Sequence, residues 1–132
     1  MGFFMNLRFI LILPFILCAP ENYGEEPTSL EKKKDEITFN DHIKPIFEKH
    51  CLLCHKSRLF AQGGLRLNTT KSILKGGDSG PSVVMGEPEN SLLMQLITLK
   101  KGEERRMPPE DRDPLNPDEI LLIEKWIQQG VK

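Results

Sequence analysis

The segment His50–Lys56, with the sequence HCLLCHK, constrains the fold of this chain more than any other feature. It holds two of the three cysteines and two of the three histidines in the chain. Cys51 and Cys54 stand about one helical turn apart, and His55 follows directly. A structural zinc site, a redox-active disulfide and a covalently attached haem all use a cysteine pair with this spacing. The rest of the sequence has to distinguish between these three.

Apolar side chains at helical spacing predict an all-α domain over residues 37–132. We expect helices over residues 38–50, 70–74, 89–99 and 117–129, joined by long loops that are rich in Gly and Pro. No segment has the alternating pattern of a β-strand. Helices this short bury little apolar surface in a domain of fewer than about 100 residues. Such a domain needs a disulfide, a metal or a large cofactor to complete its core.

The last of these helices is the clearest element in the sequence. Asn116 is its expected cap, Glu119 completes a capping box, and Gly130 ends it. Pro88 is expected to open the third helix. The residues that we expect to be buried in the third and fourth helices are Leu92, Leu93, Leu96, Ile97, Leu122, Ile123, Trp126 and Ile127.

Zinc and dithiol chemistry fit the cysteine pair poorly. A tetrahedral zinc site needs four protein ligands, and the folded region offers no second cysteine pair. Its remaining histidines are His42 and His50, and His50 adjoins Cys51 too closely for good geometry at one ion. A thioredoxin-type cysteine pair belongs to a βαβ unit, and the sequence contains no such pattern.

Covalent haem attachment suits the pattern better. In C-x-x-C-H the two thiols add to the haem vinyl groups, and the adjacent histidine ligates the iron. This assigns the two thioethers to Cys51 and Cys54 and the proximal ligand to His55. One covalently bound haem c also supplies the large apolar body that the thin core lacks. We therefore expect a small helical domain wrapped around one haem.

The N-terminal residues predict export. Residues 1–19 contain an apolar run, Phe9–Leu17, that is too short to span a bilayer but suits a signal peptide. Cys18 at its end makes lipidation or a membrane anchor an alternative to cleavage. Residues 20–36 are polar and mixed in charge, which is typical of a flexible linker. We expect the protein in the periplasm or tethered to the outer face of a bacterial membrane.

Met107 is the candidate for the second axial ligand of the iron. It lies in the sequence RRMPPED, where two arginines precede it and two prolines follow it. These neighbours offer no apolar core for the side chain to pack into. Met85 in a Gly/Pro-rich loop and Met94 inside a helix are the competitors. The position of Met94 favours core filling. The choice between Met107 and Met85 stays open.

The chain resembles class I cytochromes c, and it is most similar to the planctomycete-type single-haem domain. The resemblance implies haem attachment at Cys51 and Cys54, axial ligation by His55 and Met107, and a hydrogen bond from the proximal imidazole to the Pro81 carbonyl. The similar segments, which span residues 39–130 in order, are IKPIFEKHCLLCH, GGLRLNTT, GGDSGPSVVMGEPENSLL, RMPP and LNPDEILLIEKWIQQG.

These features predict an electron carrier without catalytic activity of its own. No residue is placed like an acid, base or nucleophile beside a substrate pocket. The formal net charge of -1 gives no reason to expect nucleic acid as a partner. We expect a monomer that meets redox proteins transiently, with a possible membrane tether at its N-terminus. A haem-based gas sensor and a dedicated redox subunit of a larger enzyme are the alternatives.

Overall fold

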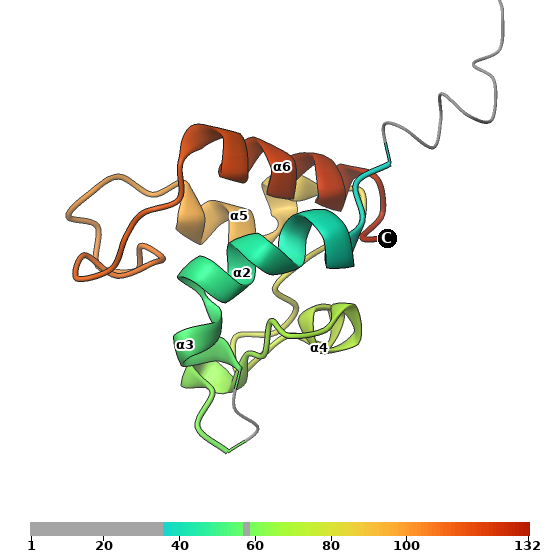
Figure 1. Ribbon diagram of the computed structural model, residues 1–132. Coiled ribbons are helices and arrows are strands. Elements are labelled where there is room, and N and C mark those ends of the chain that lie inside the picture. Colours follow the sequence, from blue (N-terminus) through green and yellow to red (C-terminus); the bar gives the residue numbers. More distant parts are fainter. Residues whose placement is uncertain (1–35, 57–58) are drawn as a thin grey trace, which may run out of the picture.

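The computed structural model describes residues 36–56 and 59–132 (Figure 1). The expected signal or anchor segment, Cys18 and the expected linker up to residue 35 lie outside the described residues. The described part is helical and has no strand, only an isolated bridge between Gly77 and Gly80. This confirms the all-α prediction. The elements are η1 (Phe39–Ile43), α2 (Lys44–His50), α3 (Leu52–His55), η2 (Gln62–Gly64), α4 (Thr70–Lys75), η3 (Pro88–Asn90), α5 (Leu92–Ile97) and α6 (Pro117–Gln128).

The first predicted helix consists of η1, a single π-helical stretch, and α2, which continues it without a break. Thr38 caps it, because its side chain accepts a hydrogen bond from the Asp41 backbone N–H. Pro45 is the second residue of α2, directly after the π-helical stretch. At Cys51 the backbone leaves the helical region, and the short helix α3 then carries the rest of the cysteine motif.

The last helix, α6, has the predicted caps. The Asn116 side chain accepts from the Glu119 N–H at 2.8 Å, and the Glu119 carboxylate accepts from the Asn116 N–H at 2.9 Å. This reciprocal pair satisfies two of the N–H groups that a helix start leaves open. The apolar stripe buries Ile123, Trp126 and Ile127 completely.

The third predicted helix is shorter than expected. Pro88 opens the 3₁₀ turn η3, and α5 begins only at Leu92, because Ser91 between them is extended. The fully buried Ser91 hydroxyl donates to the Glu87 carbonyl and accepts from the Val84 N–H, so it fixes the preceding loop. The buried face also differs from the expectation: Leu93, Met94 and Ile97 are buried, whereas Leu92 and Leu96 are only half-buried.

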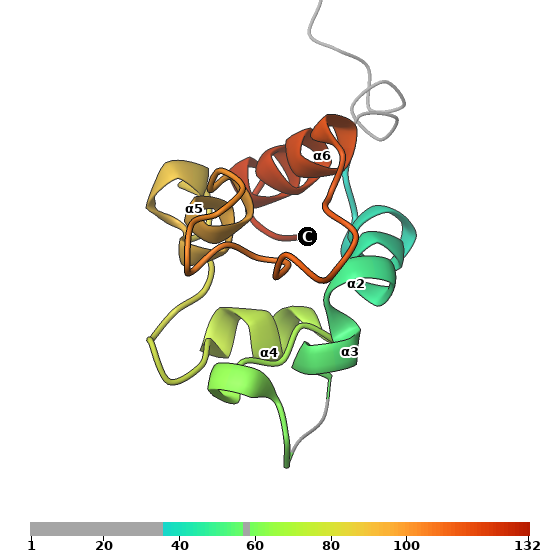
Figure 2. The same ribbon diagram turned by 90° about the vertical axis from the view of Figure 1, so that its left-hand side faces the viewer.

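An aromatic cluster joins the two ends of the domain. The Trp126 ring lies 5.9 Å from the Phe39 ring and 6.3 Å from the Phe47 ring, measured between centroids. The Trp126 indole N–H donates to the carbonyl of Lys132 at 3.0 Å, and that carbonyl also accepts from the Phe39 N–H. These contacts hold α2 and α6 side by side, as both views show (Figures 1 and 2).

The remaining elements form two groups that face each other. Helices α3 and α4 lie together, away from α6, and α5 with the loop of residues 98–116 lies opposite them (Figure 2). The cysteine motif is therefore presented across from the segment that contains Met107. Within the described ranges, no helix combines the length and apolar composition that crossing a membrane requires.

Candidate functional site

Four predicted site residues line one cavity. It measures about 220 Å³, and Cys51, Cys54, His55 and Met107 all contribute to its wall. An adjoining cavity of about 410 Å³ shares His55 and Met107 with it. Together they fall in the size range of about 300–1,000 Å³ that is common for ligand pockets. The apolar part of the wall consists of Leu53, Leu65, Leu67, Leu92, Leu93, Leu96 and Ile97.

His55 is oriented by a backbone carbonyl. Its Nδ1 lies 3.2 Å from the Leu65 carbonyl oxygen, which can only accept, so Nδ1 carries the proton. Its Nε2 is then the nitrogen with a free lone pair, and that is the atom a metal ion needs. The His55 carbonyl in turn accepts from the Leu67 N–H at 2.9 Å, so residues 65–67 fix both the ring and the backbone of His55.

The carbonyl beside the imidazole is not the one that the resemblance implied. Pro81 is exposed and lines neither cavity, and Leu65 makes the hydrogen bond instead. The reason lies in η2, where Gly63 and Gly64 both have a positive φ and turn the chain back past His55. The prediction for Pro81 is therefore corrected to Leu65.

The two cysteines are free thiols, with no disulfide between them. Burial, and to a smaller extent the nearby Cys54 and Glu119, raises the pKa of the Cys51 thiol to about 12. A thiol of this kind is protonated at neutral pH. Dithiol oxidoreductases use a cysteine whose pKa is lowered, so the environment of Cys51 is unfavourable for exchange chemistry.

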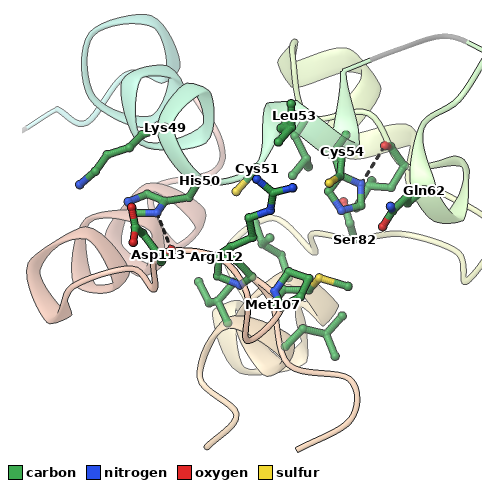
Figure 3. Close-up of a pocket in the computed structure, with 18 of the residues that line it drawn as sticks. Lys49, His50, Cys51, Leu53, Cys54, Gln62, Ser82, Met107, Arg112 and Asp113 are labelled. Carbon is green, nitrogen blue, oxygen red and sulfur yellow. Dashed lines mark hydrogen bonds between the residues drawn. The ribbon is translucent and has the colours of Figure 1, made fainter. Parts of the chain in front are cut away.

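The three candidate methionines, Met85, Met94 and Met107, differ in their surroundings. The Met107 side chain faces the cavity from the side opposite α3 (Figure 3). Met85 is 58% exposed and lines neither cavity, which removes it as a competitor for the site. Met94 is buried in the core, as its helical position predicted. Met107 is thus the methionine that shares a cavity with His55.

His50 is used to tie the end of α2 to the start of α6. Its side chain is only 1% exposed, and its Nδ1 lies 3.0 Å from the Asp113 carbonyl (Figure 3). Its Nε2 lies 3.2 Å from a Glu119 carboxylate oxygen. Lys49 donates to the same carboxylate at 3.1 Å. Burial alone would raise the pKa of Glu119, but hydrogen bonds from the Asn116 backbone, Lys49 and His50 lower it overall.

This cluster predicts an acid-sensitive contribution to stability. A carboxyl group whose pKa is lowered by folding stabilises the fold above its unfolded value of about 4.5, and the contribution is lost as the pH falls through the folded pKa. Glu119→Gln should therefore lower the free energy of unfolding at pH 7 by on the order of 1 kcal/mol, and by less at pH 4. Urea unfolding of the haem-loaded protein at both values measures the difference.

Glu124→Gln, on the same helix, is the matched control and should change little at either pH. An effect of Glu119→Gln that is equally large at pH 4 and pH 7 would show that the ionised carboxylate is not what stabilises the helix junction.

Comparison with known proteins shows which family the residues around the cavity resemble. Residues 51–111 match the family model described as Planctomycete cytochrome C. This segment, a little under half of the chain, is similar to planctomycete-type cytochrome c domains. The match begins at Cys51 and includes Met107, whereas α2 and α6, which hold the domain together, lie outside it. No curated protein and no solved structure matched the chain.

A cytochrome c domain implies haem c and an electron-transfer function, and the cavity fits that group. The donor set is the imidazole of His55, whose Nδ1 faces the Leu65 carbonyl, and the thioether of Met107 on the opposite wall of the cavity; both are ligand types of haem iron. The apolar walls suit a large flat macrocycle. Half-buried Leu92 and Leu96, which sequence patterning assigned to the core, belong to this wall. The sequence pattern could not separate this role from core packing, because Leu92 and Leu96 follow the same helical spacing as the buried Leu93.

Proposed function

We propose that this cytochrome c domain is an exported one-electron carrier with a single haem c, bonded to Cys51 and Cys54 and ligated by His55 and Met107. The observation that carries the proposal is the placement of all four residues on one cavity, with the imidazole and the thioether contributed by different elements. A haem held there would supply an iron that takes up and releases one electron. The methionine ligand favours the reduced state and so raises the potential.

Two protein ligands argue for a carrier and against catalysis. With His55 on one side and Met107 on the other, neither axial position stays open for a substrate or a gas. The contact of His55 with the Leu65 carbonyl keeps the ring in one tautomer and orientation, which lowers the reorganisation that accompanies a change of charge. We therefore propose that the domain catalyses no reaction of its own.

The proposed partner is a redox protein with an acidic surface. Between Glu48 and Asp78 the sequence has six basic side chains and no acidic one. This segment includes α3, which lines the cavity, and α4, which lies beside α3 (Figure 2). Such a surface fits a transient interface of modest size, steered by charge.

The proposed location is the periplasm or the outer face of a bacterial membrane. Cytochrome c domains are typically exported, which agrees with the apolar N-terminal run in the sequence. Cleavage of that run gives a free periplasmic protein, and lipidation at Cys18 gives a tethered one. Mass spectrometry of the mature N-terminus distinguishes the two.

The function is tested by voltammetry and carbon monoxide binding on the haem-loaded protein. On gold coated with a carboxylate-terminated layer we expect a reversible one-electron wave whose rate falls as salt rises to about 0.5 M, since salt screens the attraction. We expect the ferrous spectrum to stay unchanged under carbon monoxide. Ready binding of the gas would contradict the carrier and favour the ligand-binding alternative, and absence of a wave would contradict electron transfer.

A further inference from the structure

The side chain of Arg106, directly before Met107, is largely enclosed and is 16% exposed. Its Nε donates to the Leu99 carbonyl at 3.1 Å, and one terminal nitrogen donates to the Pro108 carbonyl at 3.2 Å. The Glu110 carboxylate lies 3.9 Å from that same terminal nitrogen. The guanidinium therefore binds one carbonyl before Met107 in the chain and one after it.

The acceptors connect Met107 to the end of α5. The Met107 N–H donates to the Leu96 carbonyl at 3.1 Å, and Leu99 follows the last turn of the same helix. Carbonyls in the last turn of a helix have no donor within the helix, so they need partners from outside. The Met107 N–H supplies one for the Leu96 carbonyl, and Arg106 binds the Leu99 carbonyl just beyond the helix, so the loop is attached to an element that also lines the cavity.

The geometry requires an arginine. The two acceptors are approached by different nitrogens of one planar group, which a guanidinium provides in a fixed fork. A lysine carries its three N–H donors on a single nitrogen, so it lacks the two separate nitrogens that approach the two carbonyls here, and a glutamine offers a shorter amide. Removing the fork leaves both carbonyls without this donor, so water has to satisfy them, which needs a looser loop.

We propose that Arg106 is a positioning residue that holds the Met107 thioether in the cavity as a ligand for the iron. The inference rests on the proposed function, because it takes Met107 as the axial ligand. Arg106 acts through the backbone on both sides of Met107, so it sets where the sulfur lies without contacting the iron. Ligand exchange at the iron then depends on Arg106.

The test uses the full-length, haem-loaded protein and the variants Arg106→Gln, Arg106→Lys, Lys101→Gln and Ile127→Val. Lys101→Gln removes a positive charge from the same loop, and Ile127→Val loosens the core in α6. The readouts are the sulfur-to-iron charge-transfer band of the ferric protein, the affinity of ferric iron for added imidazole, and thermal unfolding. Imidazole competes with Met107 for the iron, so its affinity reports how firmly the thioether is held.

We expect Arg106→Gln to weaken the charge-transfer band and to increase the apparent imidazole affinity at least about tenfold, equivalent to about 1.4 kcal/mol. The imidazole affinity of Arg106→Lys should lie between that of Arg106→Gln and that of the wild type. Lys101→Gln should match the wild type, and Ile127→Val should lower the unfolding temperature without changing the imidazole affinity. If Arg106→Gln does not take up haem, the imidazole affinity of Arg106→Lys decides.

Two failures are distinguishable. A wild-type protein without the charge-transfer band would overturn Met107 as ligand, and with it the proposed axial pair. A wild-type protein with the band, whose Arg106 variants bind imidazole as weakly as it does, would overturn the role of Arg106 and leave the proposed function intact. An equal gain in imidazole affinity in Ile127→Val would also overturn it, since general loosening of the fold would then suffice.

Discussion

We expect the substitution Met107→Ala to convert the haem iron from low spin to high spin. The alanine leaves one axial position without a protein ligand, because His55 reaches the iron only from the other side of the cavity. The ferrous variant should bind carbon monoxide readily. Its reduction potential should fall by at least about 0.1 V, a small part of the roughly 0.8 V range that axial ligands set. Absorption spectra and a redox titration measure both effects.

Two other methionines serve as controls for this variant. Met85→Ala should leave the spectrum unchanged, because Met85 is exposed and lies outside the cavity. Met94→Ala should lower thermal stability, since Met94 is buried, without altering the spin state. High-spin iron in Met85→Ala, with Met107→Ala still low spin, would show that the ligand assignment is wrong.

Trp126→Ala should have the largest effect on stability. Trp126 is fully buried, contacts both Phe39 and Phe47, and donates to the Lys132 carbonyl. Truncation removes the centre of the contact between α2 and α6 and leaves a cavity. We expect a loss of about 3–5 kcal/mol in the free energy of unfolding. At about 4–8 °C per kcal/mol for a domain of this size, the melting temperature of the haem-loaded protein falls by tens of degrees.

Trp126→Phe separates packing from hydrogen bonding at this position. The phenyl ring keeps most of the aromatic contact but leaves the Lys132 carbonyl without its indole donor, so the loss should be about 1–3 kcal/mol. Leu121→Ala, on the exposed face of α6, should change stability by less than about 0.5 kcal/mol. A loss in Trp126→Ala no larger than that in Leu121→Ala would contradict the aromatic cluster as the main link between the ends of the domain.

The elements that the sequence predicted well are those determined by local chemistry. Asn116 and Glu119 form a capping box from residues three positions apart, and Gly76 ends α4 because its φ of +77° suits a residue without a Cβ atom. The cysteine motif similarly brings Cys51, Cys54 and His55 together within a few residues. Local spacing was enough in each case.

The features that could not be predicted from the sequence depend on contacts between distant segments. Ser91 interrupts the predicted third helix because its hydroxyl bonds to a preceding loop, and no local pattern marks that choice. Leu65 replaces Pro81 beside His55 because of a turn at two glycines whose backbone angles the sequence does not specify. Arg106 belongs to the RMPP segment, but nothing in that segment indicates its role, because its acceptors are backbone carbonyls of other residues.

The most direct test of the account is whether haem is attached covalently to the exported protein. After extraction with acidified acetone, a pyridine haemochrome assay of the wild-type polypeptide should show a c-type spectrum with about one haem per chain. The Cys51→Ala, Cys54→Ala double variant should lose its haem to the same solvent. Polypeptide that carries no haem, or that releases all of it to the solvent, would contradict the central claim.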